Sequence, residues 1–478
     1  MVTKRNHFLF LIVLVLLLLP IFFINLTLKA TLCLTLAITA ISFFLLLTKN
    51  QSTKQIYMLD FACYKPPAAQ AMTKEGIVAR ARDHNKFYKE ETLAFMRSTI
   101  ERSGLGDSTY FPEAFFKDRP DPNMEEARAE VEAAIFGSVD EVLAKAKVKS
   151  RDIGIVVVNC CIFCPAPSLS SMIVNWYKMK ENVISYNLSG MGCTAGLIAV
   201  NLAKQLLQVH HDSYALVVST ESITENCYMG NDRSKFLINC LFRVGGAAVL
   251  LSNRPADHRT AKYQLLHAIP THTARSDKCY SCIISEEDTD GHAGVTITKD
   301  LLAAAIAAIE SNITSLAPLI LPLSKQARFV LNAFTRRLRW VKNDKPEYVP
   351  DFKKSCDHFL PHVGGKPVLD ELQRSLRMTK SDMEASRMTL YRFGNTSSSS
   401  VWYELAYVEA KGRIRRGDRV WHMAFGSGFK CCSVVWRAIR TVDDDAVMNP
   451  WSGEIDGFPV DLDEDAPFTY FFEPSKTT

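Results

Sequence analysis

The segment Val183-Ile-Ser-Tyr-Asn-Leu-Ser-Gly-Met-Gly-Cys-Thr-Ala-Gly196 joins a strand-like apolar run to a helical pattern through two glycines. Glycine tolerates the positive φ of a sharp turn, and Cys193 then stands where the free N–H groups of the helix N-terminus converge. A cysteine in that place gains thiolate character from the helix dipole. Most cysteines are small core residues. Cys193 is therefore either a core cysteine or, because of its place at the turn, a nucleophile.

Short apolar runs on both sides of this segment are of the buried-strand type, and a helical pattern from Cys193 to Leu207 lies between the first two. These runs are 155–158, 215–219 and 247–251. Strands that alternate with helices predict an α/β fold with a buried sheet. A helical, polar stretch at 74–103 precedes them.

After Asn253-Arg254-Pro255 the order of elements restarts. The pattern predicts strands at 263–268 and 420–425 and helices at 299–310, 367–376 and 399–411. Each half contains a strand, a glycine turn and a helix, at 190–193 and at 394–397. We therefore predict a duplicated fold with halves at 49–255 and 256–478, although the two turns share no readable sequence identity.

Composition sets the broad class of the protein. Forty-seven per cent of the 478 residues are hydrophobic and 22 per cent are charged, which is typical of a globular protein and excludes wholesale disorder. The net charge of +5 is spread too evenly for a nucleic-acid-binding protein. Thirteen cysteines without a clustered framework indicate reduced thiols facing the cytosol.

The N-terminal 48 residues form the most hydrophobic part of the chain, and Lys29 is the only charge between Phe8 and Leu47. This stretch is about twice the roughly 20 residues that cross a bilayer core, so we predict a transmembrane hairpin of helices 8–28 and 30–47. Lysine and arginine flank both ends, which predicts a cytosolic N-terminus and a cytosolic body.

Two rival motifs give weaker hypotheses. Gly190-x-Gly192-x-x-Ala195 matches a dinucleotide-binding fingerprint, but Asp212 precedes the 215–219 strand instead of ending a strand. His358 and His362 have metal-ligand spacing, but Pro361 disrupts the helix that would align both rings. We predict no metal site.

Three further segments carry groups that a cysteine nucleophile needs. His362 precedes Gly364 and Gly365, and Asn395 lies just before the 399–411 helix. Taken singly, these residues are also compatible with a half-buried histidine and an ordinary helix cap. Gly426-Ser427-Gly428 offers free N–H groups for an oxyanion hole, or forms a simple turn between strands.

Several long motifs, in this order, resemble the plant-type 3-ketoacyl-CoA synthases, the membrane-bound condensing enzymes of very-long-chain fatty acid elongation. They are Asn187-Leu-Ser-Gly-Met-Gly-Cys193, Met229-Gly-Asn-Asp-Arg-Ser234, Asn239-Cys-Leu-Phe-Arg243, His362-Val-Gly-Gly365, Arg392-Phe-Gly-Asn-Thr-Ser-Ser-Ser-Ser400 and Ala424-Phe-Gly-Ser-Gly-Phe-Lys-Cys431. That family is similar to chalcone synthases. The resemblance implies the thiolase fold, with two related halves in αβαβα layers.

The resemblance also implies roles for single residues. Cys193 would carry the acyl group, with His362 and Asn395 completing the catalytic set, and residues 426–428 would form the oxyanion loop. Four supporting residues follow from it: His272, His358, Gly364 and Gly365. The chain differs from the family pattern at Ala274-Arg-Ser-Asp277 and at Leu360-Pro361. These differences would affect the local geometry of the site and the rate of the reaction.

The implied reaction joins a long-chain acyl-CoA to malonyl-CoA with loss of CO₂ and gives a 3-oxoacyl-CoA two carbons longer. It implies no permanently bound cofactor, because CoA arrives with the substrates. A catalytically silent elongase scaffold is the main alternative, and a membrane-tethered NAD oxidoreductase is a more distant one.

The expected setting is a multi-pass protein of the endoplasmic reticulum membrane. Expected partners are a second copy in a homodimer and the ketoacyl-CoA reductase, hydroxyacyl-CoA dehydratase and enoyl-CoA reductase of an elongase. The basic segment 326–343 is either a solvated helix with a core stripe or a contact with anionic lipid. Cuticular wax, suberin, seed oil and sphingolipid are all compatible products.

Overall fold

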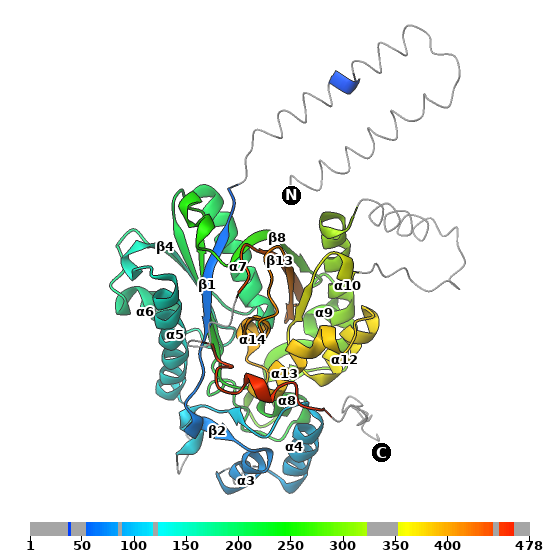
Figure 1. The fold of residues 1–478 in the computed structure, drawn as a ribbon. Helices are drawn as coiled ribbons and strands as arrows, with labels where there is room; N and C mark the ends of the chain where they lie inside the picture. Colours follow the sequence, from blue (N-terminus) through cyan, green and yellow to red (C-terminus); the bar gives the residue numbers. More distant parts are fainter. Residues whose placement is uncertain are drawn as a thin grey trace, which may run out of the picture. The chain divides into compact units, whose positions relative to one another are not determined.

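The computed structural model describes residues 37–39, 54–84, 88–117, 123–322, 352–442 and 449–462 (Figure 1). The chain divides into two compact units, residues 1–54 and 55–478. The predicted transmembrane hairpin lies outside the described residues, apart from a helical stretch at 37–39. The basic segment 326–343 lies outside them as well. The following account therefore concerns the second unit.

A nine-stranded mixed sheet forms the centre of this unit, in the order β11-β12-β13-β8-β1-β7-β6-β4-β5. Its strands are β1 (Tyr57–Cys63), β4 (Ile153–Asn159), β5 (Ile184–Leu188), β6 (Tyr214–Thr220), β7 (Gly246–Ser252), β8 (Tyr263–His272), β11 (His358–Pro361), β12 (Arg419–Gly426) and β13 (Lys430–Ala438). Strand β1 pairs with β7 on one side and, through Tyr57 and Met58, with β8 on the other. The two predicted halves thus share one sheet and one compact unit.

The strand order repeats within this sheet. The series β1-β7-β6-β4 in the first half corresponds to β8-β13-β12-β11 in the second. In both series the first two pairings are antiparallel and the third is parallel. This correspondence supports the duplication that the order of elements predicted.

Helices lie in three layers around the strands. Helix α5 (Met124–Ala146) covers β1, β6 and β7, and α10 (Leu301–Ile320) covers β8, β12 and β13. Helices α7 (Ala195–Val209) and α14 (Ser400–Ala410) lie between the two parts of the sheet (Figure 1). The result is the αβαβα layering expected from the resemblance.

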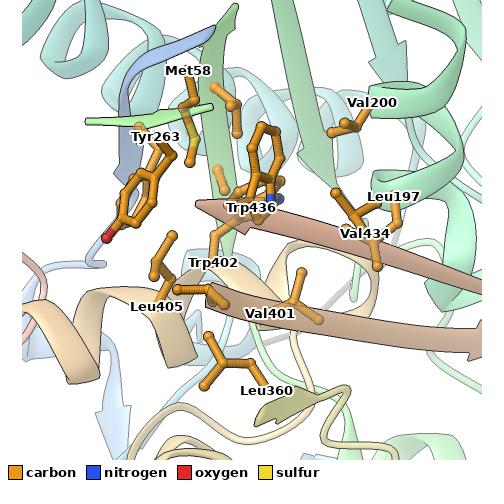
Figure 2. Packing of buried hydrophobic residues seen from close by; sticks show 14 of the residues in the cluster. Met58, Leu197, Val200, Tyr263, Leu360, Val401, Trp402, Leu405, Val434 and Trp436 are labelled. Carbon is orange, nitrogen blue, oxygen red and sulfur yellow. The ribbon is translucent and has the colours of Figure 1, made fainter. Parts of the chain in front are cut away.

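The central layer is held by a large hydrophobic core (Figure 2). Leu197 and Val200 of α7 are one helical turn apart and pack on the same cluster as Trp402 of α14. Trp402 lies with its ring centroid 6.4 Å from that of Trp436 on β13. Each such buried side chain contributes about 1.5–3 kcal/mol, so the N-termini of α7 and α14 are fixed relative to each other.

The other elements surround this centre. They are α3 (Lys74–His84), α4 (Glu90–Arg102), α6 (Leu169–Trp176), α8 (Arg233–Leu241), α9 (Asp277–Ser281), β9 (Ile283–Glu287), β10 (Ala293–Ile297), α12 (Lys366–Ser375), α13 (Glu384–Phe393), and the short pair β2 (Ala71–Met72) and β3 (Thr109–Tyr110). The described residues contain one helix long and apolar enough to cross a membrane. This helix is α10, and half of it is buried in the core.

Candidate active site

Cys193 lies at the turn between β5 and α7. Gly190 and Gly192 have φ values of +66° and +58°, and a short 3-10 turn, Gly192–Thr194, leads into the helix. The Thr194 hydroxyl donates to the carbonyl of Met191 at 2.7 Å. This is the sharp glycine turn that the sequence predicted, with the thiol at the start of the helix.

The loop 426–428 packs directly against this turn. A Cβ atom on Gly192 would lie 2.6 Å from the backbone nitrogen of Ser427, and one on Gly426 would lie 2.7 Å from the nitrogen of Cys193. Two glycines are therefore required for the two backbones to approach this closely. Because Ser427 covers Gly192, a dinucleotide pyrophosphate could not approach the backbone at this second glycine of the fingerprint.

His362 follows β11 and is almost fully buried. Its N–H donates to the carbonyl of Met423 at 2.8 Å, and its Nδ1 lies 2.6 Å from the Ser400 hydroxyl at the start of α14. The Nε2 atom is the ring nitrogen that remains for the cavity. Burial lowers the pKa of His362 to about 3, so the resting imidazole is neutral.

Asn395 is held on both sides by the end of α8. Its N–H donates to the carbonyl of Leu241 at 3.1 Å, and its carbonyl accepts from the N–H of Arg243 at 3.0 Å. The side-chain Oδ1 accepts the N–H of Ser397 at 2.9 Å. Since Oδ1 is occupied, the Nδ2 atom is the group that can donate into the cavity.

A cavity of about 500 Å³ joins these groups. Cys193, His362 and Asn395 all line it. So do the predicted glycines and loop residues: Gly364, Gly365, Gly426, Ser427 and Gly428. Much of the remaining wall is apolar, from Leu237, Ile238, Leu241, Ile283, Ile297 and Leu301. The structure therefore unites a thiol, an imidazole, an amide and backbone N–H groups beside an apolar wall.

Two predicted supporting residues lie elsewhere. His358 begins β11, bonds Asp418 through Nε2 at 3.0 Å, and faces a different cavity. It stands four residues before His362 along an extended strand, which separates the two residues by roughly 13 Å. The prediction that His358 supports the active site is therefore wrong. His272 ends β8, is exposed, and does not line the active cavity, although its ring approaches Gly428.

Sequence reasoning missed Glu221 and Ser397. Ser397 Oγ lies 3.6 Å from Cys193 Sγ and 3.3 Å from Glu221 Oε2. Glu221 directly follows β6, at the carboxyl end of a strand that runs parallel to β4, which is where α/β sheets place functional side chains. Ser397 is two residues from Asn395, and this proximity was the available signal.

The surroundings of Cys193 oppose the thiolate character that its place at the helix N-terminus predicts. Burial raises the pKa of Cys193 to about 12, Ser397 lowers it by hydrogen bonding, and the neighbouring Cys161 and Glu221 raise it further. These effects act against the helix dipole and favour the neutral thiol. Forming the thiolate therefore requires a proton acceptor, and the imidazole of His362 and the carboxyl group of Glu221 both line the cavity.

Comparison with known proteins identifies the family. Residues 48–338 match the family described as FAE1/Type III polyketide synthase-like protein, and residues 353–438 match the 3-oxoacyl-[acyl-carrier-protein] synthase III C-terminal family. The chain is 54% identical to 3-ketoacyl-CoA synthase 2 of Arabidopsis thaliana over 422 residues, 87% of this chain and 80% of that protein. It is 52% identical over 418 residues to the probable 3-ketoacyl-CoA synthase 20 of Oryza sativa subsp. japonica, covering 87% and 79%. The chain belongs to the 3-ketoacyl-CoA synthase family.

Solved structures share the fold of this 3-ketoacyl-CoA synthase. CsyB complexed with CoA-SH superposes with a TM-score of 0.62 at 21% identity, over 80% of this chain and 100% of that one. The C-terminal type III polyketide synthase domain of Steely1 from Dictyostelium gives a TM-score of 0.63 at 17% identity, covering 80% and 99%. The solved structures show the fold, and the family relationship shows an acyltransferase that performs the condensing step of fatty acid elongation.

Proposed function

We propose that this 3-ketoacyl-CoA synthase carries out its condensation on Cys193, with His362 and Asn395 acting on the malonyl thioester. The observation that supports this proposal is the single cavity that Cys193, His362, Asn395 and the 426–428 loop share. The substrates are a long-chain acyl-CoA and malonyl-CoA, and the products are a 3-oxoacyl-CoA two carbons longer, CO₂ and CoA.

In the first half-reaction, the proton of the Cys193 thiol moves to Nε2 of His362, and Ser400 accepts the Nδ1–H of the resulting imidazolium. The thiolate attacks the acyl-CoA carbonyl. The oxyanion that develops is met by the N–H of Cys193 and an N–H of the 426–428 loop, and each such donor is worth about 2.7–4 kcal/mol. CoA leaves as a thiolate, and the acyl group remains on sulfur.

In the second half-reaction, the imidazolium Nε2–H of His362 and the Nδ2 amide of Asn395 donate to the thioester oxygen of malonyl-CoA. Loss of CO₂ places an enolate charge on that oxygen, which two donors stabilise better than one. The enolate carbon attacks the acyl thioester, and Cys193 leaves as a thiolate. It takes back the proton from His362, so the site returns to its neutral state.

The test separates the two half-reactions. Asn395→Ala should still accept an acyl group from labelled acyl-CoA but should fail to release CO₂ from labelled malonyl-CoA. Cys193→Ala should fail to accept the acyl group, and so should form no condensation product. Single-turnover acyl transfer and CO₂ release are followed separately, with folding verified by thermal melting. Full activity of Cys193→Ala, or complete loss of acyl transfer in a folded Asn395→Ala protein, would contradict the assignment.

The setting of the enzyme is part of the same proposal. The apolar N-terminus with positive flanks supports a two-helix anchor in the endoplasmic reticulum membrane, with the body in the cytosol. A 3-oxoacyl-CoA needs reduction, dehydration and a second reduction to become a saturated acyl chain, which supports the three elongase partners named above. We also expect a homodimer.

Protease added outside sealed microsomes tests the orientation. The body from Tyr57 onward should be digested, and a small N-terminal fragment should remain protected. A protected body would contradict the proposed topology. Chemical cross-linking of two differently tagged copies in the same microsomes tests the homodimer.

A further inference from the structure

A buried carboxyl group and a buried hydroxyl lie beside the thiol of Cys193, and neither has a role in the reaction steps above. Ser397 is 1% exposed and Glu221 is 4% exposed. Polar groups that are closed off from water must be satisfied inside the protein. The Ser397 hydroxyl is the link between them, because it lies within reach of both Glu221 Oε2 and Cys193 Sγ.

Glu221 is fixed in place by donors from neighbouring segments. The N–H of Cys161 donates to Oε2 at 3.1 Å, and the N–H of Ile162 donates to Oε1 at 3.2 Å. The amide of Asn226 lies 3.4 Å from Oε1. Burial raises the pKa of this carboxyl, whereas backbone donors on both oxygens favour its ionised form. We assign it as a carboxylate that accepts these bonds.

Ser397 is held in an uncommon backbone conformation. Its φ is +57°, a region that non-glycine residues seldom occupy and that recurs at functional sites. The bond from its N–H to Asn395 Oδ1 stabilises this conformation. A serine hydroxyl carries one hydrogen, so Ser397 can donate to Glu221 or to Cys193, but not to both at once.

We propose that Glu221 and Ser397 form a hydrogen-bond switch that controls the protonation of Cys193, an inference that rests on the role proposed for Cys193. In the resting enzyme the hydroxyl donates to Glu221 and accepts the thiol S–H. When the thiol proton moves to His362, the hydroxyl turns and donates to the new thiolate. Glu221 is a positioning residue that holds the resting cysteine as a thiol, and Ser397 stabilises the attacking thiolate.

Other titratable groups near the thiol do not replace this pair. Burial keeps Cys160, Cys161 and His362 neutral, and the Cys160 thiol donates to Glu221 Oε1 at 3.4 Å. The ammonium group of Lys430 donates to the carbonyl of Ser427 at 3.2 Å, on the loop opposite the turn. Glu221 is thus the anionic group that faces Cys193 from the end of β6.

The proposal predicts opposite effects of two substitutions. Ser397→Gly removes the hydroxyl and is compatible with the positive φ, so it should raise the pKa of Cys193. Glu221→Gln removes the negative charge and the competing acceptor, so it should lower that pKa. A hydrogen bond to a charged group corresponds to a pKa difference of about one to two.

The assay is the alkylation of Cys193 by iodoacetamide in the full-length protein in membranes, measured at pH 7 to 9 by mass spectrometry of the peptide. Below the pKa the alkylation rate is proportional to the thiolate fraction, so a pKa that differs by about one changes the rate about ten-fold. Ser397→Gly should react at least about ten-fold more slowly than wild type, and Glu221→Gln at least about ten-fold faster. Cys164, which is exposed, is the internal reference.

Ser398→Ala is the matched control. The Ser398 hydroxyl is buried beside Ser397 and has no hydrogen-bond partner among the described residues, so its removal should leave the alkylation rate unchanged. Ser397→Ala is the second variant if Ser397→Gly does not fold. Rate changes in the same direction for the Ser397 and Glu221 variants, or no change in either, would overturn the switch. Alkylation does not require condensation, so this outcome is distinct from a failure of the proposed function, which Cys193→Ala reports.

Discussion

Gly426→Ala tests the contact between the 426–428 loop and the Cys193 turn. A Cβ atom at this position would lie 2.7 Å from the nitrogen of Cys193 and 3.0 Å from that of Thr194, whereas ordinary contact begins at 3.4 Å. The two backbones must therefore separate by about 0.7 Å. Both neighbours are main-chain atoms, so no flexible side chain can absorb the change.

The expected consequence is a large loss of rate with a modest loss of stability. The new methyl group stands against the N–H of Cys193, which is one of the two proposed oxyanion donors. Loss of one such donor lowers kcat by about 100- to 1,000-fold. Overpacking of this kind lowers the free energy of unfolding by about 1–3 kcal/mol.

The assay measures condensation of acyl-CoA with labelled malonyl-CoA at saturating substrate, together with thermal melting to verify folding. Gly154→Ala is the control, because a Cβ atom there would meet Ser213 at an ordinary 3.7 Å. It should retain kcat within about two-fold. If folded Gly426→Ala also retained a wild-type kcat, the loop would not act on the Cys193 N–H and the oxyanion proposal would be wrong.

Three other substitutions give distinct outcomes. Ser400→Ala removes the partner of His362 Nδ1. Loss of one hydrogen bond of about 0.5–1.5 kcal/mol should lower the rate of CO₂ release about two- to ten-fold, and the affinity measured by acyl-CoA titration should be unchanged. Leu241→Trp fills part of the apolar wall, so the chromatographed products should become shorter, and an unchanged chain-length profile would argue against that wall as the acyl site. Because the folded-state pKa of His362 is about 3, below the ordinary 6.5, the unfolded state takes up more protons as the pH falls from 6.5 towards 3. Stability is lost in that window by up to about 1.4 kcal/mol per pH unit, and His362→Asn should lose less than wild type in melting experiments at pH 6.5 and 4.5.

The sheet could be predicted where its strands are continuous apolar runs. The runs 215–219 and 247–251 became β6 and β7 with one residue added at each end, because both faces of these strands are buried. Strand β1 was missed, since Asp60 interrupts its apolar run, and that carboxylate is paired with Lys262 at 2.9 Å. Helix α10 extends well beyond the predicted 299–310 and continues to Ile320 with a proline inside.

The site residues also fall into those with a local sequence signal and those that only the packing brings together. The turn at Cys193 has a local signal, two glycines before a helix, and could be found from the sequence. His362 and Asn395 could be assigned only through the family resemblance, because their proximity to Cys193 is created by the packing of the two halves. The contact between Glu221 and Ser397 also arises only from that packing. The sequence around each residue gives no sign that the two share a hydrogen bond.

The place of β1 in the sheet has a consequence for how the chain is made. Every residue of β1 is buried, and the strand lies between β7 and β8, whose residues are synthesised much later. At roughly 5–20 residues per second, a ribosome needs roughly 10–40 s to proceed from β1 to β7. During that time an apolar strand emerges without its neighbours and is exposed to aggregation, so production of this protein should depend on chaperones that shield the nascent chain. A chain shortened to begin after Cys63 should be strongly destabilised, because it lacks the buried strand that joins β7 to β8.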